Sequence, residues 1–487
     1  MTPANGLKRK RAGVTTSAAH PVKKHAVDAK TSISSSPIHI QIVTGSYERT
    51  LHGISATIPH SVFRHASHEN VHFHHTFLFA AHASAIRCLA ISPAANDADT
   101  RFLATGSSDE RINVYSLSTA PPPPPKTTSK PILPSLSAAA IAENPRNKSL
   151  GSLTHHDRAI TRLQFLHKNR LFSAAEDATI CISRTRDWTV LTSLKAPIPK
   201  PQGRPSGDTA GPGEIPAGVN DFAIHPSQKL MLTVGRGEKC IRLWNLMTGK
   251  RAQALNFERD LLLQVGESKC SSGEGRRVVW DRAGENYVVG FERGAAVFGI
   301  DCKPKAVIRP ATKIHQMRFM SPPPEDDEES TLAISTEDGR IVLYDLSQID
   351  EASDASKLPQ VQPKAEIGGR AAGVTGRVKD FDIVFLDESA KVVNGSGAWL
   401  FVAASSDGAV RLWSLPFGWK RDIKKEGNHR TETAQVGQLI ATKEAGSRIT
   451  CVGAFLLDGQ PSAIEEATDD MAGAGIDGSE ESEDDSE

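Results

Sequence analysis

The sequence predicts an all-β fold, a seven-bladed β-propeller closed by strands from the N- and C-terminal parts of the chain. Three observations support this prediction. A short sequence motif recurs along the chain, and each copy joins a tight turn to a strand of alternating residues. Before the first copy and after the last there are strands that do not make up a complete blade. A single blade cannot bury both of its faces, so repeats of this kind stack into a closed ring.

The recurring motif is clearest at residues 405–415, Ser-Ser-Asp-Gly-Ala-Val-Arg-Leu-Trp-Ser-Leu. Asp407-Gly408 suits a tight turn, because its central residues adopt backbone angles that most side chains resist. The residues after the turn alternate, as expected where successive side chains of a strand point to opposite faces of a sheet. Related copies occupy residues 107–117, 175–183, 237–246, 336–346 and, in degenerate form, 290–298.

Six internal copies leave a seventh blade to be assembled from the remaining strands. The strand at 448–455 has no turn motif after it, and the pair of strands at 38–44 and 50–58 has no strand before it. Together these strands would complete the last blade. Closing the ring in this way removes exposed sheet edges, which would otherwise invite aggregation.

We expect three regions: a disordered basic leader over 1–36, the propeller over 37–460 and a disordered acidic tail over 461–487. The leader carries seven basic residues and one acidic residue, whereas residues 465–487 carry eleven acidic and no basic ones. Opposite charges on two tails favour partner binding over catalysis. Blades need roughly 40–45 residues, and the longer spacing predicts loop insertions near 119–151, 197–217, 321–330, 347–376 and 419–436.

Two basic clusters in the leader resemble a bipartite nuclear import signal. They could also contact nucleic acid, or simply keep the leader soluble. The clusters consist of Lys8, Arg9, Lys10 and Arg11, and of Lys23 and Lys24.

Cysteine usage and hydropathy indicate an intracellular protein. The six cysteines show no Cys-x-x-Cys spacing, and several lie in predicted strands, where cysteine acts as a small apolar residue. We find neither a secretory leader nor an apolar run near the ~18 residues that span a bilayer. We therefore expect no membrane association.

Catalytic, cofactor and metal sites are not predicted. His72, His74 and His75 are the densest histidine group, but strand alternation separates His75 from the other two, and no cysteine or carboxylate completes a set. Gly235-Arg236-Gly237 lacks the third glycine and the helix of a phosphate loop. No Gly-x-Ser-x-Gly motif is present, so we do not expect an enzyme.

Two histidines have spacings that favour a structural role. Each lies four residues before the first apolar residue of an inner strand, and a turn aspartate follows each of them. A histidine that donates to a buried aspartate would tie blade loops together, since buried polar groups destabilise a fold unless they are paired. The expected polar network comprises His82, Asp109, His156, Asp177, Asp338 and Asp407.

Four arginines lie on loops that should face one end of the ring. They are Arg158, Arg236, Arg377 and Arg448. Arginine makes bidentate contacts with phosphate and carboxylate alike, so a basic rim there could bind RNA or an acidic partner surface. Solvated charges with no partner are the alternative.

The Asp-x-x-Ile-x-x-Trp motifs resemble those of WD40 repeat proteins. A narrower resemblance, to the p21-activated-kinase-interacting protein family, rests on residues 45–48 (Gly-Ser-Tyr-Glu), 175–182, 376–380 and 404–408. It covers most of residues 38–456. The chain departs from WD40 patterns at Ser183, at Glu238 and throughout the fourth blade.

This resemblance implies a non-catalytic scaffold for maturation of the large ribosomal subunit and pre-rRNA processing in the nucleolus. The implied partners are pre-ribosomal proteins and pre-rRNA, bound by a monomer within a larger assembly. Animal relatives are also described as negative regulators of a p21-activated kinase, so a signalling adaptor is the alternative. A hydrolase on a propeller is disfavoured, because no acid–base or metal set is evident.

Overall fold

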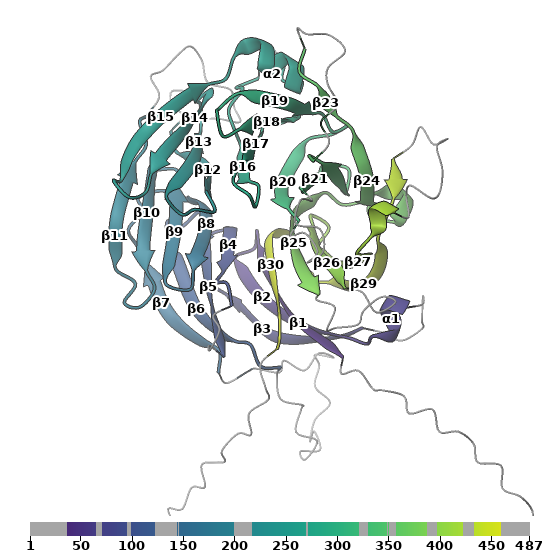
Figure 1. Ribbon diagram of the computed structural model, residues 1–487. Coiled ribbons are helices and arrows are strands. Elements are labelled where there is room, and N and C mark those ends of the chain that lie inside the picture. The colour runs from purple at the N-terminus through teal and green to yellow at the C-terminus, as the bar shows by residue number, and fades with distance from the viewer. Residues whose placement is uncertain are drawn as a thin grey trace, which may run out of the picture. The chain divides into compact units, whose positions relative to one another are not determined.

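Seven sheets, each built on four antiparallel strands, form a ring in the computed structural model (Figure 1). The innermost strand of each sheet lines the centre, and the strands that follow lie progressively outward. The fold is the seven-bladed propeller predicted from the repeats. The structure describes residues 37–64, 71–94, 99–121, 144, 146–198, 217–268, 271–320, 330–347, 349, 357–386, 397–421 and 433–458.

The first three blades take their strands in chain order from the centre outward. Blade 1 consists of β4 (Ile86–Ile91), β5 (Thr100–Ser107), β6 (Ile112–Ser118) and β7 (Lys148–Leu153). Blade 2 consists of β8 (Ile160–His167), β9 (Arg170–Ala175), β10 (Thr179–Arg184) and β11 (Val190–Lys195). Blade 3 consists of β12 (Val219–Ile224), β13 (Leu230–Gly235), β14 (Cys240–Asn245) and β15 (Lys250–Asn256).

Blades 4 and 5 each gain a short fifth strand, which pairs in parallel with the outer edge. Blade 4 consists of β16 (Arg277–Trp280), β17 (Asn286–Gly290), β18 (Ala295–Gly299), β19 (Pro304–Ile308) and the added β23 (Gln360–Val361). Blade 5 consists of β20 (Ile314–Phe319), β21 (Thr331–Thr336), β22 (Arg340–Asp345), β24 (Pro363–Gly368) and the added β28 (Ala434–Gln435).

Blade 7 closes the ring as predicted, with its inner strand from the C-terminal part of the chain. Blade 6 precedes it with β25 (Val378–Leu386), β26 (Ala398–Ser405), β27 (Ala409–Pro416) and β29 (Gln438–Glu444). Blade 7 consists of β30 (Ile449–Leu456), β1 (Ile38–Ser46), β2 (Thr50–Ile58) and β3 (His72–Ala80). The antiparallel ladder between β1 and β30 runs from Ile40 opposite Leu456 to Ser46 opposite Ile449.

Three short helices interrupt the strands in the described part of the chain: α1 (Ser61–Arg64), α2 (Arg259–Val265) and the 3₁₀ helix η1 (Arg370–Ala372). Helix α2 lies between blades 3 and 4. It buries Leu261, Leu262 and Val265 in the cluster that joins these blades. The fourth blade begins after this helix, at β16.

Several intervals predicted as loops contain strands. Strand β24 lies within 347–376 and forms the outer strand of blade 5, β28 lies within 419–436, and β7 begins inside the interval 119–151. The residues of β7 are mostly exposed. An outer strand is backed on only one side, so it carries little of the apolar alternation by which strands are recognised in a sequence.

The turns of the repeated motif adopt the backbone angles predicted for them. Gly408 has a φ of 85°, and a Cβ added there would lie 2.9 Å from the carbonyl oxygen of Ser447. Both its backbone conformation and its surroundings therefore favour glycine. Glu110 and Ala178 hold the corresponding position in blades 1 and 2 at φ values of 68° and 61°.

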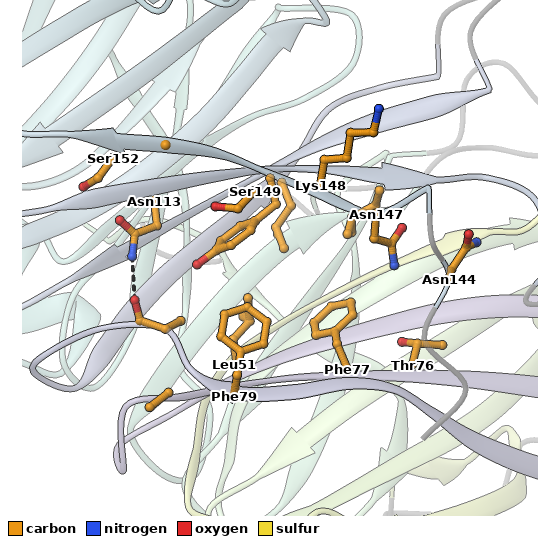
Figure 2. Close-up of a pocket in the computed structure, with 16 residues that line it drawn as sticks. Leu51, Thr76, Phe77, Phe79, Asn113, Asn144, Asn147, Lys148, Ser149 and Ser152 are labelled. Carbon is orange, nitrogen blue, oxygen red and sulfur yellow. Dashed lines mark hydrogen bonds between the residues drawn. The ribbon is translucent and has the colours of Figure 1, made fainter. Parts of the chain in front are cut away.

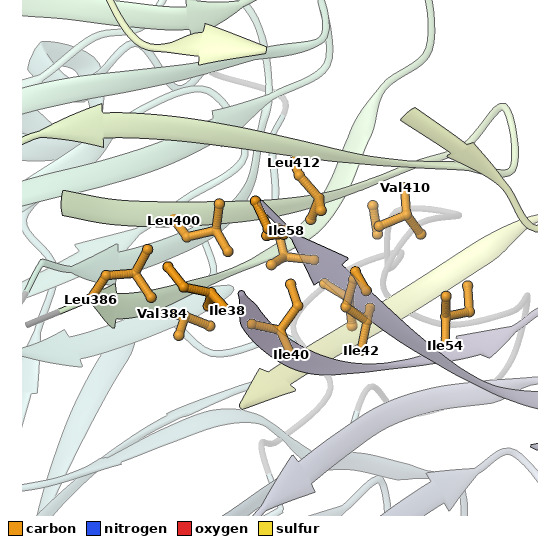
Figure 3. Packing of buried hydrophobic residues seen from close by; sticks show 14 of the residues in the cluster. Ile38, Ile40, Ile42, Ile54, Ile58, Val384, Leu386, Leu400, Val410 and Leu412 are labelled. Carbon is orange, nitrogen blue, oxygen red and sulfur yellow. The ribbon is translucent and has the colours of Figure 1, made fainter. Parts of the chain in front are cut away.

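The apolar core consists of layers between neighbouring blades. Figure 3 shows the layer between blades 6 and 7, where Ile40, Ile42 and Ile54 meet Leu400 and Leu412. All five side chains are fully buried. The N-terminal strand pair is therefore part of the main core, and the closure of the ring buries substantial apolar area.

We expect removal of β1 to open the ring. A chain lacking residues 1–46 loses its ladder partner for β30 and exposes the edges of both β2 and β30, so it should aggregate or lose cooperative unfolding in urea. A chain lacking only residues 1–36 keeps every described strand and is the matched control. Equal unfolding midpoints for the two chains would contradict closure by β1.

Candidate functional site

One end of the ring gathers the loops that precede the inner strands and the turns between the second and third strands. Backbone hydrogen bonds join these two sets: Ser406 N donates to Arg377 O at 2.9 Å, and Arg236 N donates to Gly218 O at 2.9 Å. The four arginines predicted to form a rim all lie on these loops, where Arg158 is exposed. The topology therefore places them at the same end.

Three of the four rim arginines have contacts that hold them in place. Arg236 Nη2 lies 3.0 Å from Glu176 Oε1, and Arg377 Nε lies 3.3 Å from Glu337 Oε1. The Arg448 guanidinium lies 5.7 Å from the centre of the Tyr47 ring. Arg377 remains half exposed, so its second face is available to a partner.

Inside the rim, each blade contributes one residue to the channel mouth, the central opening at this end. These residues lie at the start of the inner strands. In most blades a register shift there leaves one residue of the inner strand without a partner on the second strand. The channel mouth comprises Arg87, Thr161, Asn220, Arg276, His315, Lys379 and Thr450. Thr161 Oγ1 donates to Val219 O at 2.6 Å, and Thr450 Oγ1 donates to Ile86 O at 2.6 Å, so both threonines join neighbouring blades.

A cavity of about 280 Å³ opens at the channel mouth. Its polar lining is mainly basic, and the lining residues include Arg87, Arg236, Arg276, Arg277, His315 and Glu274. Glu176 accepts from both Arg87, at 2.7 Å, and Arg236. Two arginines thus share one carboxylate there.

The cations of the channel mouth perturb one another. Burial, followed by the charges of Lys379, Arg377, Arg277 and Lys313, lowers the pKa of His315 to about 4. Burial, followed by the charges of Arg377 and Arg448, also lowers the pKa of Lys379. Among the described residues, no carboxylate oxygen lies within 4 Å of the side-chain nitrogens of Arg277, Lys379 or Arg448. A phosphate or carboxylate bound here would relieve this repulsion.

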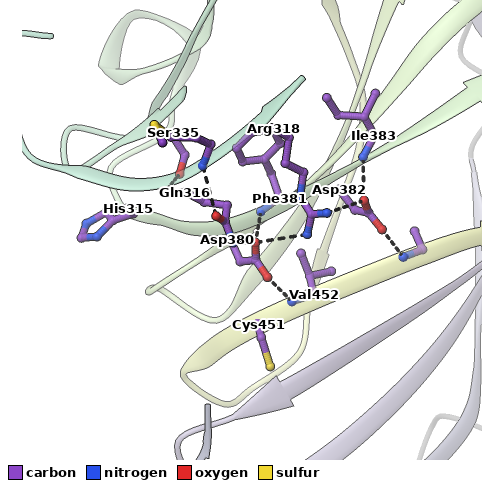
Figure 4. A network of polar contacts seen from close by, with 12 residues as sticks. His315, Gln316, Arg318, Ser335, Asp380, Phe381, Asp382, Ile383, Cys451 and Val452 are labelled. Carbon is purple, nitrogen blue, oxygen red and sulfur yellow. Dashed lines mark hydrogen bonds and ion pairs between the residues drawn. The ribbon is translucent and has the colours of Figure 1, made fainter. Parts of the chain in front are cut away.

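Deeper in the channel, carboxylates from one blade bind the inner strand of the next (Figure 4). Asp380 accepts from Val452 N at 3.0 Å and from Gln316 Nε2 at 3.1 Å, and Asp382 accepts from Ala454 N at 2.9 Å. In blade 3, Asp221 likewise accepts from Val278 N at 3.1 Å. The inner strand of a blade has one edge without a ladder partner, so these carboxylates satisfy its free amides.

Arg318 lies between the two carboxylates of blade 6, 3.6 Å from Asp380 and 3.4 Å from Asp382. Although burial opposes its charge, Asp382 and Asp380 raise the pKa of Arg318. Burial raises the pKa of Asp382 despite this arginine. The carboxylates of this set accept hydrogen bonds from the neighbouring blade, whereas Arg318 Nε has no hydrogen-bond partner among the described residues. The lower channel therefore joins neighbouring blades to one another.

The predicted histidine–aspartate pairs form in blades 1 and 2. His82 Nδ1 lies 3.1 Å from Asp109 Oδ2, and His156 Nδ1 lies 3.0 Å from Asp177 Oδ2. The other ring nitrogens contact hydroxyl groups, His82 with Thr105 at 2.9 Å and His156 with Ser173 at 2.8 Å. Both histidine side chains are fully buried.

The two pairs differ in protonation. Burial is the main cause that lowers the pKa of His82. Burial is also the largest single effect on His156, but the hydrogen bonds and charges of Asp177 and Cys181 together outweigh it and raise the pKa of His156 to about 9. Asp177 in turn has its pKa lowered to about 2, because hydrogen bonds from His156 and Thr179 outweigh its own burial. His82 is therefore neutral, and the blade 2 pair is ionic.

The other two turn aspartates are bound by arginines. Asp338 accepts from Arg340 Nε at 2.7 Å and from Thr336 Oγ1 at 2.5 Å, and Asp407 accepts from Arg411 Nη2 at 2.8 Å. No described histidine contacts either of them. The six predicted residues thus form separate clusters, one in each blade, in place of a single network.

A second cavity lies on the side of the ring, between the outer strands of blades 7 and 1 (Figure 2). It has a volume of about 540 Å³, and Phe77, Phe79, Leu51 and Tyr115 form its apolar wall. Asn113 Nδ2 donates to Ala81 O at 2.6 Å at one side of it. The two cavities would select different chemistry, anionic groups at the channel mouth and apolar groups here.

The structure also groups side chains that could bind a metal ion. His155, His156 and Cys181 each offer one ligand atom, and these atoms lie within 4.8 Å of one another. From the sequence, only the histidines of β3 were considered for metal binding. Cys181 has no signal in the sequence for this role, because strand pairing is what brings this cysteine to the two histidines.

The channel-mouth residues were likewise not predicted. A usable signal was present, since each lies directly after the first apolar residue of an inner strand in most blades. The import clusters Lys8–Arg11 and Lys23–Lys24 lie outside the described residues. Within those residues, no helix is long and apolar enough to cross a membrane.

We expect Asp109→Ala to lower the free energy of unfolding by about 1–3 kcal/mol, because the buried His82 Nδ1 loses its acceptor and the exposed amide of Ala83 loses one as well. Denaturant unfolding measures this change. Asp407→Ala is the comparison, since its carboxylate is more exposed and should cost less. An unchanged unfolding midpoint for Asp109→Ala would show that the pair does not stabilise the blade.

Comparison with known families supports the repeat assignment. The profile described as "WD domain, G-beta repeat" matches residues 73–116. This segment contains the outer strand of blade 7 and the first three strands of blade 1. A repeat in the sequence therefore spans two blades of the structure and joins them covalently.

Several curated proteins are similar over much of the chain. "p21-activated protein kinase-interacting protein 1-like" of Xenopus laevis is 24% identical over 421 residues, which cover 86% of this chain and 83% of that protein. "Protein MAK11" of Saccharomyces cerevisiae is 28% identical over 403 residues, covering 77% and 78%. "Shk1 kinase-binding protein 15" of Schizosaccharomyces pombe is 25% identical over 248 residues, covering 50% and 53%.

None of these names denotes an enzyme, and WD40 propellers typically serve as scaffolds. The predicted resemblance is thus confirmed: the chain is a seven-bladed β-propeller with a WD40 repeat match, and it is similar over most of its length to p21-activated protein kinase-interacting proteins and to Protein MAK11.

Proposed function

We propose that the protein is a non-catalytic scaffold in large ribosomal subunit assembly and pre-rRNA processing in the nucleolus. The observation that carries the proposal is the similarity to Protein MAK11 over most of both chains, together with the nucleolar role that the family resemblance implies. The channel mouth and the four rim arginines are the proposed contact surface for pre-ribosomal partners. The basic clusters Lys8–Arg11 and Lys23–Lys24 would direct import into the nucleus.

The proposed partner at the channel mouth is anionic, and RNA phosphate fits it best. Lys379, Arg277 and Arg448 have no carboxylate within 4 Å among the described residues, and Arg377 is half exposed beside them. A phosphodiester presents repeated charges at a spacing that several such groups can contact at once. An acidic protein surface would use the same groups, so the RNA assignment needs a direct test.

We expect the variant Arg377→Glu/Arg448→Glu to bind single-stranded RNA more weakly, with the slope of log K against log salt reduced by about two. Filter binding of the full chain over a range of salt concentrations measures both quantities. Arg251→Glu is the matched control: Arg251 is exposed at the start of β15, at the opposite end of the ring. Equal salt slopes for the wild-type chain and the double variant would count against RNA contact at the rim.

The role in assembly is tested in the protein's native cells. Depletion should reduce large subunits in a sucrose gradient. Re-expression of the wild-type chain or Arg251→Glu should restore them, whereas Arg377→Glu/Arg448→Glu should not. Normal large-subunit levels after depletion would contradict the proposed function.

The second candidate is a signalling adaptor that restrains a p21-activated kinase. It is favoured by the names of the relatives, several of which are called p21-activated protein kinase-interacting proteins, and another a Shk1 kinase-binding protein. Affinity purification separates the two candidates. Ribosomal proteins and precursor RNA among the co-purified components support the scaffold, and a kinase alone supports the adaptor.

A further inference from the structure

Blade 2 brings two adjacent histidines to a cysteine from another strand. His155 and His156 precede β8, and Cys181 lies in the middle of β10, directly opposite Ser173 of β9. The hydroxyl of Ser173 lies 3.2 Å from His155 Nε2 and 2.8 Å from His156 Nε2. The two imidazole rings lie 4.7 Å apart, centre to centre. Two nitrogen donors, a sulfur and a hydroxyl thus converge on one small volume.

Blade 1 provides an internal comparison. It has the same histidine–aspartate pair and the same hydroxyl partner, His82 with Asp109 and Thr105. The positions equivalent to His155 and Cys181 there are Ala81 and Asn113, and Asn113 Nδ2 donates to Ala81 O. The structural pair therefore forms without the additional histidine and cysteine, so stabilisation of the blade does not explain their presence in blade 2.

The surroundings suit a metal ligand set. Asp177 and Thr179 lie at 3.0 Å from His156 Nδ1, so the Nε2 atom points toward Ser173. A carboxylate on the far nitrogen is the usual partner of a metal-binding histidine, because it fixes the ring orientation and strengthens the ligand. His156 and Cys181 are buried, whereas His155 is half-buried and provides a route of entry.

We propose that His155, His156 and Cys181 bind one zinc ion, with Ser173 Oγ or a water as the fourth ligand. Two imidazoles and one thiolate form a set of intermediate softness, which zinc accepts in tetrahedral geometry. The ligand atoms are up to 4.8 Å apart, and small side-chain rotations bring them to tetrahedral spacing. Zinc displaces the thiol proton of Cys181 and the Nε2 proton of His156 into solvent, with no change in oxidation state.

Cobalt titration of the full-length, reduced and EDTA-dialysed chain tests this site. One Co²⁺ per chain should give visible d–d bands of a tetrahedral complex and a thiolate-to-cobalt charge-transfer band, and Zn²⁺ should abolish both. The test variant is His155→Ala/Cys181→Asn, which gives blade 2 the residues that blade 1 carries and so preserves the fold. It should lose the charge-transfer band and at least about 100-fold in affinity, since even outer-shell losses cost 10–100-fold.

His155→Ala alone should weaken cobalt binding while keeping the charge-transfer band, because Cys181 is retained. His74→Ala, in the exposed histidine group of β3, should change nothing. Absence of the charge-transfer band in the wild-type chain overturns the proposal. Cobalt bands that persist in the double variant, or that disappear with His74→Ala, overturn it as well.

Discussion

The hydrogen bonds of strand β30 hold the propeller together, because this strand completes a sheet whose other members lie about four hundred residues earlier in the chain. Its outer edge pairs with β1, and its inner edge donates to Asp380 and Asp382 of blade 6. The strand is therefore fixed from both sides. Ile449 and Val452 of this strand also belong to the apolar layer between blades 6 and 7.

The same ring geometry explains the separation of chemistry between the two ends of the channel. In the lower channel, carboxylates satisfy the free amides of inner strands, and Arg318 balances their charge. At the channel mouth the inner strands begin, and most of the channel-mouth side chains are half-buried. Basic residues outnumber carboxylates there: Arg87 and Arg236 share Glu176, whereas Arg277 and Lys379 form no ion pair with a described carboxylate. A rigid scaffold thus presents an anion-binding surface with little cost in conformational entropy.

The repeats made the ring and its closure predictable, because turn aspartates and inner strands carry their signal locally. An outer strand such as β7 was not predictable, since its residues are mostly exposed and show no apolar alternation. Helix α2 was also missed, because its short apolar run resembles a buried strand. At the candidate site, the spacing of His82 and Asp109 predicted that the two side chains pair, and in the structure they lie in contact within blade 1. Contacts between blades, such as Asp380 with Val452, depend on the closed ring and have no signature in either segment.

Placing the two terminal segments in one sheet has a consequence for biosynthesis. Strand β1 is synthesised about four hundred residues before β30, so the edge of β1 that pairs with β30 must wait unpaired through the synthesis of six blades. Contacts this distant along a chain are also slow to form. During that interval the nascent protein exposes a β-edge and a row of isoleucines, the features that chaperones bind. A ribosome stalled before β30 would release a product that carries six complete blades and still cannot close the ring.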